Sequence, residues 1–347
     1  MNRAATIALA PLSALYSAAV KARSAGYESQ FLKTFRVRVP VISVGNITVG
    51  GTGKTPLVQA LANHLAQSGR RVCILTRGYR REGGKQRVVV SDGERILSDV
   101  AHAGDEALML AQALLGKASV LCDTDRVAGA RWAINNLNAE VLLLDDGFQH
   151  RRLSRDLDIV TIDSSNPFGN GRLLPAGILR EPVNSLRRAD CIVLTRVSDE
   201  ASPDLIEQIR AVTAALLVTS RTIIEGVRQL NGDEVDGNSV KQQPLVAFCG
   251  IGNARAFFQQ LRAAHFDVRH EVAFSDHHKY SQTDVDRITE QAEAHGAQAL
   301  ITTAKDAVKL QSLRFGLACY VSQIEVEISD ASTLHALIER AIAKKAN

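Results

Sequence analysis

The chain has 347 residues, which is enough for about two domains. Its 46% hydrophobic and 22% charged residues are typical of an ordinary folded protein and exclude long disordered regions. The net charge of +4 is too small to indicate a nucleic-acid-binding protein, and we predict no obligate protein partner.

The N-terminal segment is apolar but only weakly hydrophobic. Residues 4–20, AATIALAPLSALYSAAV, fall short of the ~20 strongly apolar residues of a membrane-spanning helix. Pro11 is typical of a helix start, and one helical face beyond it carries Leu12, Leu15, Tyr16 and Ala19. We therefore expect residues 1–28 to form a membrane-associated helix on an anionic membrane surface. A helix packed on the protein's own core is the alternative that this pattern leaves open.

Between residues 29 and 218, strand-like apolar runs alternate with helical patterns. The predicted strands are Val39–Val44, Val72–Leu75, Val88–Val90, Ala118–Cys122, Val141–Leu144, Ile159–Ile162 and Cys191–Thr195. The predicted helices are Pro56–Ser68, Asp105–Leu115 and Asp125–Leu137. This alternation predicts an α/β fold in which a parallel sheet carries helices on both faces.

A glycine-rich loop follows the first predicted strand, in VISVGNITVGGTGKTP. The strand–loop–helix order is the context of a phosphate-binding P-loop, whose backbone N–H groups and helix N-terminus attract phosphate oxygens. The predicted nucleotide-binding residues are Thr48, Val49, Gly50, Gly51, Thr52, Gly53, Lys54 and Thr55. We expect Lys54 to reach the β- and γ-phosphates and the Thr55 hydroxyl to ligate Mg²⁺. The strict P-loop pattern has a glycine where this chain has Thr48.

Two aspartates end another apolar strand. In VLLLDDGFQHRRL, Asp145 and Asp146 follow four apolar residues, at the carboxyl end of the strand, where ligands bind in an open α/β sheet. One of the two carboxylates is expected to hold Mg²⁺ directly or through water. An aspartate pair that only caps a turn before Gly147 is the structural alternative.

The alternating pattern weakens from residue 219 to residue 243. Asn231-Gly232 and Asp236-Gly237 are turn signals between short β-like runs, so we expect a hairpin linker over 219–243. Strand and helix patterns resume at Pro244. They predict a second, smaller α/β domain over residues 244–347.

The motifs narrow the class of nucleotide-dependent protein. A GTP switch should carry N-K-x-D or T-K-x-D, but in TTAKDAVK (Thr302–Lys309) the lysine immediately precedes Asp306, which is the wrong spacing. No further helicase or transporter signature is visible. Three classes stay open: a kinase, a P-loop regulatory NTPase that acts on a protein partner, and a membrane scaffold with a vestigial nucleotide site.

A kinase needs an acidic side chain that accepts the proton of the attacking hydroxyl. Asp105 in HAGDEALML lies at a loop–helix junction, where an ordinary N-cap is the alternative. SDHHKYS offers His277 and His278, one of which can orient a catalytic aspartate, although an exposed turn explains this pattern equally well. Adjacent histidines point in different directions, so we expect no zinc site there.

Arginines are frequent in the loops that follow predicted strands. Their planar guanidinium groups suit bidentate binding of anionic oxygens. These arginines are Arg77, Arg126, Arg151, Arg152, Arg155, Arg172 and Arg180.

Taken together, these segments resemble the tetraacyldisaccharide 4'-kinase family, the lipid A 4'-kinases. The resemblance covers nearly the whole chain and rests on APLSALYSAAVKAR, SVGNITVGGTGKTP, TRGYRR, GDEALML, DTDR, DDGFQHRRL, LLPAGILREP, AFCGIGN, FSDHHKY and TTAKDAVKL. The first block is similar to the family's N-terminal membrane segment, and DDGFQHRRL is highly specific. The family's P-loop also lacks the first glycine, which accounts for Thr48. The last block usually has Glu where this chain has Ala304.

The resemblance implies a reaction and a location. The enzyme would transfer the γ-phosphate of ATP, with Mg²⁺, to the 4'-hydroxyl of a tetraacylated glucosamine disaccharide 1-phosphate, which gives lipid IVA. An acylated substrate implies the cytoplasmic face of the bacterial inner membrane, with the enzyme held peripherally or by a single N-terminal anchor. The two-domain layout predicts a cleft that closes over ATP and the acceptor, with SDHHKY approaching from the C-terminal domain.

The resemblance also implies roles for individual residues. The implied catalytic residues are Asp105 as general base, its partner His277, Asp146 and Lys54. The implied metal ligands are Thr55 and Asp145, and the implied substrate-binding residues are Arg77, Arg126, Gln149 and His150. The eight residues from Thr48 to Thr55 are implied to bind ATP.

Overall fold

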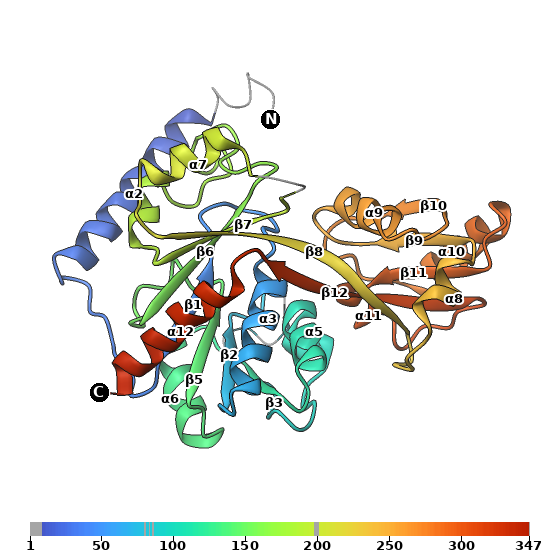
Figure 1. The fold of residues 1–347 in the computed structure, drawn as a ribbon, viewed down its shortest axis with the longest axis horizontal. Helices are drawn as coiled ribbons and strands as arrows, with labels where there is room; N and C mark the ends of the chain where they lie inside the picture. The colour runs from blue at the N-terminus through green and yellow to red at the C-terminus, as the bar shows by residue number, and fades with distance from the viewer. Residues whose placement is uncertain (1–8, 80, 83, 85–86, 198–200, 347) are drawn as a thin grey trace.

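The structure is a computed structural model that describes residues 9–79, 81–82, 84, 87–197 and 201–346. In this part of the chain, twelve strands join into one sheet with the order β10-β9-β11-β12-β8-β7-β6-β1-β5-β2-β4-β3. Helices cover both faces of the sheet (Figure 1), so the predicted α/β fold class is confirmed. The molecule is elongated along the sheet, with the N-terminal half at one end and the C-terminal half at the other.

The N-terminal half holds a parallel sheet with one antiparallel edge strand, β3. Its strands are β1 (Val41–Gly45), β2 (Val72–Thr76), β3 (Val88–Ser91), β4 (Ala118–Cys122), β5 (Val141–Asp145), β6 (Leu157–Asp163), β7 (Cys191–Thr195) and the start of β8 (Leu216–Gln229). Strands β1, β2, β4, β5 and β7 are buried at every position. Both of their faces are covered by helices, which is why each strand is an almost unbroken apolar run in the sequence.

The helices of this half pack on opposite faces of the sheet. They are α3 (Lys54–Gln67), α4 (Val100–Ala103), α5 (Asp105–Ala113), α6 (Arg126–Asn136), the 3₁₀ helix η1 (Val183–Arg188) and α7 (Pro203–Arg210). Ile74 of β2 lies in the core shared with α3 and α5, whereas its neighbours Cys73 and Leu75 lie in the core under α6. This is the two-residue alternation of a strand. The three helices predicted in this half are confirmed to within a few residues.

The C-terminal half is a smaller α/β layer. Its strands β9 (Leu245–Cys249), β10 (Val268–Ala273) and β11 (Ala299–Thr303) are parallel, and β11 also pairs in parallel with β12 (Ala318–Ile328). Its helices are α8 (Gly237–Lys241), α9 (Ala254–Ala263), α10 (Gln282–Ala294) and α11 (Ala304–Ala307). Phe257 and Phe258 of α9 pack on one face, and Ile288 of α10 packs on the other.

Two long strands connect the halves (Figure 1). The start of β8 pairs in parallel with β7, and its remainder pairs antiparallel with β12. The segment 219–243, expected to be a hairpin linker, forms most of β8, a small hairpin turn at Asn231-Gly232 closed by an antiparallel bridge between Arg228 and Glu234, and the short helix α8. The partner of β8 comes about 100 residues later, so a local turn signal could not reveal this pairing.

The last helix, α12 (Ala331–Ala346), returns to the N-terminal half although it lies within the expected C-terminal domain. Leu334 and Ile338 are fully buried in the core that α3 also lines. Arg70 binds Glu339 through two hydrogen bonds of 2.8 and 2.6 Å. The expected boundary at residue 244 therefore does not separate two independent units, because α12 follows this boundary in the sequence but packs on the N-terminal half.

The helix α2 (Ala10–Glu28) lies along the N-terminal half, and residues 1–8 of the predicted N-terminal helix are outside the described residues. Ser13 Oγ donates to the Leu173 carbonyl at 2.8 Å, and the Tyr16 hydroxyl donates to the Arg180 carbonyl at 3.0 Å. Leu12 and Leu15 are 55% and 69% exposed. Tyr16 therefore faces the protein, whereas the two leucines point outward.

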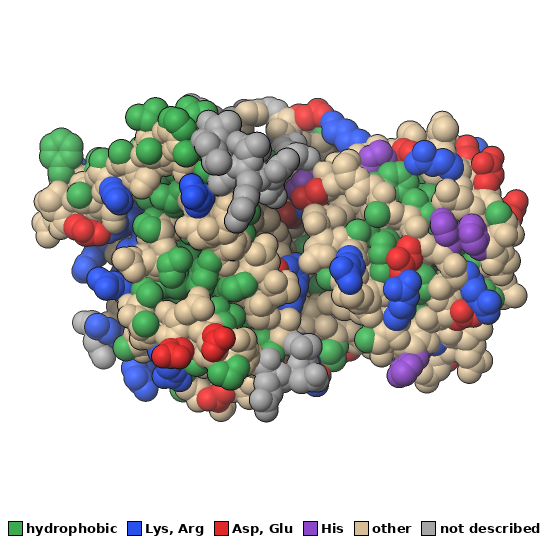
Figure 2. All heavy atoms as spheres, turned by 90° about the horizontal axis from the view of Figure 1, so that it is seen from above, with side chains coloured by type: hydrophobic (Ala, Val, Ile, Leu, Met, Phe, Trp, Pro, Cys, Tyr) green, Lys and Arg blue, Asp and Glu red, His purple; other side chains and the backbone are tan. Residues whose placement is uncertain are grey.

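Hydrophobic and basic side chains lie side by side over the α2 end of the molecule in Figure 2. Ala18, Ala19 and Ala22 are exposed on the same side of α2 as the two leucines. Within the described residues, no helix combines the length and the apolar character needed to cross a membrane.

Candidate active site

The glycine-rich loop joins β1 to α3 at the carboxyl edge of the sheet. Helix α3 begins at Lys54, and Gly53 caps it with φ of 75°, a left-handed backbone conformation. A Cβ atom at residue 53 would lie 3.3 Å from Thr195 Cγ2 at the end of β7. Both the backbone angle and the lack of space thus favour glycine. The first N–H groups of α3 have no partner within the helix and are suited to bind phosphate oxygens.

Buried polar side chains support the loop from inside. Thr52 is 4% exposed, and its Oγ1 shares a 2.7 Å hydrogen bond with Thr161 Oγ1 of β6. Asn46 Nδ2 donates to Thr52 Oγ1 at 3.0 Å, and Thr195 Oγ1 donates to the Thr52 carbonyl at 3.0 Å. These bonds tie the loop to β6 and β7, so the conformation of the loop is fixed by the sheet.

Thr48 occupies the position where the strict P-loop pattern has glycine. It is 5% exposed and pairs with Leu179 in an isolated β-bridge. Val49 is 43% exposed, and its N–H donates to the Ile178 carbonyl at 2.8 Å. This end of the loop is thus fixed by the segment around residue 178, and a flexible glycine is not needed there.

Asp146 follows β5 with φ of 55° and is held by two cations. Arg180 donates to both carboxylate oxygens, at 2.7 and 3.0 Å, and Lys54 Nζ lies 3.7 Å from Oδ1. Burial raises the pKa of Asp146, but the Arg180 hydrogen bonds and the Lys54 charge outweigh burial and lower this pKa. Asp146 is therefore ionised at neutral pH and forms an ion pair with the lysine of the loop.

Asp145, the last residue of β5, has the opposite electrostatic environment. It is 3% exposed, and its Oδ1 has no hydrogen-bond partner among the described residues. Burial, followed by the charges of Glu106 and Asp146, raises its pKa to about 7, although Lys54 and Arg126 act in the other direction. A buried carboxylate oxygen without a partner is costly, and a bound cation would remove that cost.

The donor set suits magnesium better than a metal held by protein alone. In the described part of the chain, no three His, Cys, Asp or Glu side chains are grouped so that they could hold a metal ion. Mg²⁺ is commonly bound by one or two carboxylates together with phosphate oxygens and water. Asp145 fits this pattern, and Thr55, the second residue of α3, remains the other predicted ligand.

Arg126, one of the predicted substrate-binding arginines, lies near the acidic pair. Arg126 begins α6, is 4% exposed and donates to the Asp123 carbonyl, and its Nε has no hydrogen-bond partner among the described residues. Burial lowers the pKa of Arg126, and the nearby charges of Asp145 and Asp146 oppose this change. Arg77 is exposed after β2, and its charge also acts on Arg126. The site therefore combines two carboxylates with several cations.

Gln149 and His150 lie between this cluster and α2. The side-chain Nε2 of Gln149 donates to the Asn46 backbone carbonyl at 2.8 Å. The backbone carbonyl of Gln149 accepts from Arg23 of α2, also at 2.8 Å. His150 Nε2 is buried without a hydrogen-bond partner in the described structure. Burial, and then the charges of Arg126 and Arg23, lower the pKa of His150 to about 4, so the ring is neutral at pH 7.

Asp105 and His277 meet across the two halves of the molecule. Asp105 begins α5, and His277 lies in the loop between β10 and α10, 172 residues later. His277 Nδ1 is 2.7 Å from Asp105 Oδ2, and the two side chains are only 11% and 7% exposed. Gly104 occupies the N-cap position, so Asp105 is not the ordinary N-cap that the sequence left open.

The two adjacent histidines do point in different directions. His278 stacks on Phe274 with ring centroids 4.5 Å apart, and its Nε2 lies 3.1 Å from Asp284. His277, in contrast, points into the junction and is mostly buried. The exposed turn that was the alternative for this segment therefore does not describe His277.

The structure gives a position in the site to three charged residues that had no individual role in the sequence analysis. Arg180 forms a bidentate ion pair with Asp146, and Glu106 lies 3.1 Å from the Lys305 ammonium. Arg180 was one of several similar loop arginines, and Glu106 stands next to Asp105 in the sequence. Lys305 belongs to TTAKDAVK, whose spacing does not match the guanine-recognition motif. Local patterns contained no further signal that distinguished these three.

The phosphate-loop residues and the Asp105–His277 pair are neighbours in space. Helices α3 and α5 pack side by side on one face of the sheet (Figure 1), and both begin at its carboxyl edge. The charge of Glu106, next to Asp105, contributes to the raised pKa of Asp145. The phosphate loop, the acidic pair and the Asp105–His277 pair thus surround one region.

Comparison with known proteins agrees with this arrangement. Residues 5–343 match the family described as tetraacyldisaccharide-1-P 4'-kinase. A tetraacyldisaccharide 4'-kinase from Geobacter metallireducens is 39% identical over 99% of this chain and 100% of its own length. Another, from an Anaeromyxobacter species, is 44% identical over 89% of this chain and 84% of its own length.

A solved structure is similar over nearly the whole fold. The crystal structure of LpxK from Aquifex aeolicus in complex with ATP has a TM-score of 0.80 and 34% identity, and the match covers 97% of this chain and 99% of that one. Family, relatives and fold agree over the same residues. The chain therefore belongs to the tetraacyldisaccharide-1-P 4'-kinase family.

Proposed function

We propose that this chain transfers the γ-phosphate of ATP to the 4'-hydroxyl of tetraacyldisaccharide 1-phosphate, which gives lipid IVA in lipid A biosynthesis. The observation that carries the proposal is the buried Asp105–His277 pair beside a P-loop and its lysine. A carboxylate held in this way is suited to accept a proton from an acceptor hydroxyl. The P-loop supplies the phosphate-binding half of the same reaction.

The residues divide the work of phosphoryl transfer. Lys54 and Arg126 attract the phosphate oxygens, and Asp146 with Arg180 keeps the Lys54 side chain in place. The sugar hydroxyl gives its proton to Asp105 while its oxygen bonds to the γ-phosphorus. The bond from that phosphorus to the β-phosphate oxygen breaks, and ADP leaves. The chain contributes mainly position and charge, which is what this reaction needs.

In the proposed reaction, Asp145 and Thr55 would hold Mg²⁺. When bound, Mg²⁺ offsets the negative charge of the phosphate oxygens. The unpartnered Oδ1 of Asp145 supports this role, because a cation would supply the missing partner. The bidentate contact with Arg180 leaves Asp146 the role of orienting Lys54.

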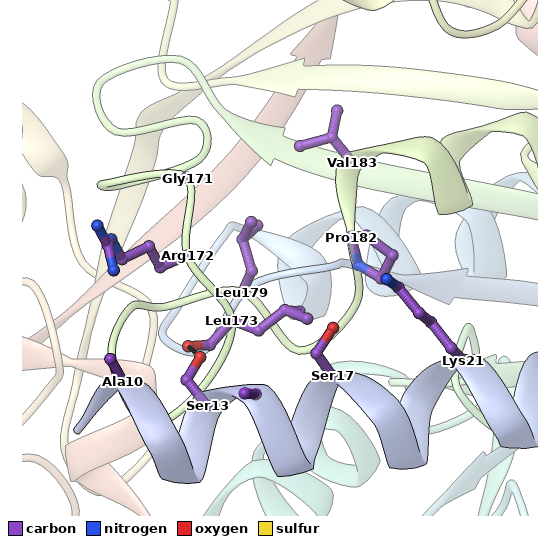
Figure 3. Close-up of a pocket in the computed structure, with 11 residues that line it drawn as sticks. Ala10, Ser13, Ser17, Lys21, Gly171, Arg172, Leu173, Leu179, Pro182 and Val183 are labelled. Atoms are coloured by element: carbon purple, nitrogen blue, oxygen red, sulfur yellow. Dashed lines mark hydrogen bonds between the residues drawn. The ribbon is translucent and has the colours of Figure 1, made fainter.

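A hollow beside α2 supports the proposal that the acceptor is acylated. It measures about 380 Å³ and lies between α2 and residues 171–183. Figure 3 shows Leu173 and Leu179 in its middle, with Arg172 and Lys21 at opposite ends. An apolar floor flanked by cations suits an acyl chain attached to a phosphorylated sugar.

We assign the enzyme to the cytoplasmic face of the bacterial inner membrane, with α2 lying on the lipid surface. The exposed side chains of Leu12 and Leu15 support this orientation, as do Lys21 and Arg23 behind them. Replacing both leucines with serine should weaken binding to anionic vesicles about tenfold or more. Leu97→Ser, at a leucine that is 52% exposed elsewhere, is the matched control. Equal vesicle binding by all three proteins would contradict the assignment.

The activity itself is tested with γ-labelled ATP. The label should appear on the acylated disaccharide, and ADP release should depend on that acceptor. A regulatory NTPase, the alternative function, would release the same amount of phosphate with and without the lipid. That result, with no label on the lipid, would overturn the proposed function.

A further inference from the structure

The segment TTAKDAVK contributes a lysine to the Asp105–His277 pair. Helix α11 follows β11 directly and carries Lys305, whose side chain is 16% exposed. Its Nζ lies 3.1 Å from Glu106, 3.2 Å from Asp276 and 3.4 Å from His277 Nε2. Lys305 thus touches both halves of the molecule at the point where Asp105 and His277 meet.

An ammonium group has three hydrogen-bond donors and no acceptor. In a hydrogen bond with Lys305, 3.4 Å away, His277 Nε2 is therefore the acceptor and carries no proton. The ring proton is then on Nδ1, where it is donated to Asp105 Oδ2 at 2.7 Å. Asp276 Oδ2 lies 3.6 Å from Nε2, which is beyond hydrogen-bonding distance.

The surrounding charges keep Lys305 in its ammonium form. Burial lowers the pKa of Lys305, but Glu106, Asp105 and Asp276 outweigh burial and raise it. A second cation, Lys309 Nζ, lies 2.8 Å from the buried Asp306 and 4.0 Å from Asp105 Oδ2.

We propose that Lys305 is a positioning residue that holds His277 as the neutral Nδ1–H tautomer, so that Asp105 stays an unprotonated carboxylate able to accept the sugar proton. The inference rests on the proposed function, because it assigns Asp105 the role of general base. It adds to that function the group that fixes where the proton of the pair resides. Lys305 acts through His277, and Asp105 alone takes the proton.

The direct test is the protonation of the His277 ring in the full-length protein. With ¹⁵N-labelled histidine, the ring nitrogens of the nine histidines can be observed, and His277→Asn identifies the signals of His277. We expect a protonated Nδ1 and an unprotonated Nε2 in the unaltered protein. In Lys305→Met, Nε2 should gain a proton, and in Lys305→Arg, which keeps a donor, it should stay unprotonated.

Transfer kinetics provide the second readout. Lys305→Met should lower kcat about 10- to 100-fold with KM for ATP unchanged, because proton acceptance is impaired and nucleotide binding is not. Lys305→Arg should recover most of that loss. Lys279→Met is the matched control, since Lys279 forms another ion pair between the halves, 3.6 Å from Glu82, and is 89% exposed. It should change neither the ring signals nor kcat.

Three results would overturn the inference. One is an unchanged His277 spectrum in Lys305→Met, and another is an Nε2 proton already present in the unaltered protein. The third is a loss of kcat in Lys279→Met as large as that in Lys305→Met, which would show that only docking of the halves matters. Because the spectra require no substrate, a failure of lipid phosphorylation itself would be recognised separately as failure of the proposed function.

Discussion

The phosphate-loop side and the Asp105–His277 side of the site are assembled in different ways. The loop, Lys54, Asp145 and Asp146 all come from neighbouring strands of one parallel sheet and the helix that follows it. Asp105 and His277 come from opposite halves of the molecule and meet in a single 2.7 Å contact. The first side depends on local topology, and the second depends on how the two halves dock.

This difference separates nucleotide binding from proton transfer. The hydrogen bonds of Thr52 with Asn46, Thr161 and Thr195 remain within the N-terminal half, so the loop keeps its shape whatever the other half does. His277 reaches Asp105 only when the C-terminal half is docked. We infer that disturbing the second side impairs transfer while leaving ATP affinity intact.

The largest effect is expected for Asp105→Asn, which removes the proton acceptor but keeps the shape of the side chain. It should lower kcat by about 10²–10⁴ and leave ATP affinity unchanged, which is measured by transfer assays together with nucleotide titration. An unchanged kcat would exclude Asp105 as the base. Weaker ATP binding would contradict the separation of the two sides.

Lys54→Ala should affect the phosphate-loop side of the site. Loss of the P-loop ammonium should lower kcat/KM for phosphate transfer by about 10²–10³, because charge stabilisation of the transferred group is lost. Asp146 would then keep Arg180 as its remaining ion-pair partner. The control is Lys117→Ala. Lys117 directly precedes β4, at the amino end of the strand and away from the loop, so this variant should have normal kinetics. Equal activity of the two variants would refute the predicted role.

Leu334→Ala tests whether α12 belongs to the nucleotide-binding half. Leu334 is fully buried in the core that α3 lines, so its truncation should lower the free energy of unfolding by about 2–5 kcal/mol. Chemical denaturation measures this change, with Leu115→Ala, at a leucine that is 44% exposed, as the control. A cost below about 0.5 kcal/mol, as at an ordinary surface site, would show that α12 does not stabilise this half.

The last effect concerns Asp145, whose folded-state pKa is raised to about 7 from an ordinary value of 3.8. An acid whose pKa is raised by folding destabilises the fold as pH increases, so this cost develops between about pH 4 and pH 7. Without divalent metal, Asp145→Asn should therefore raise the free energy of unfolding at pH 8 by up to about 4 kcal/mol, because each pKa unit corresponds to about 1.4 kcal/mol, and have little effect at pH 4.

Denaturation at the two pH values, in the presence of a chelator, measures this pH dependence. The same gain at both pH values would mean that the substitution acts through something other than the charge of residue 145. Mg²⁺ should remove the advantage of the variant at pH 8, because the cation then provides the charge that the buried carboxylate lacks.

Most elements and motifs could be predicted from the sequence alone because they depend on neighbouring residues. The fully buried strands are continuous apolar runs, and Gly53 and Lys54 precede a helix with a regular apolar face, so both the fold class and the phosphate loop followed from local patterns. The roles given to Asp105 and His277 came from the family resemblance, and their spacing in the sequence alone left each with an ordinary structural explanation.

Only the tertiary structure decided which distant segments meet. It paired β8 with the distant strand β12, returned α12 to the first core, and placed Lys305 against His277. It also distinguished the two adjacent aspartates, since Arg180 binds Asp146 and leaves Asp145 Oδ1 without a partner. Burial and Coulomb interactions depend on the three-dimensional surroundings of a group, and these surroundings are set by residues far away along the chain.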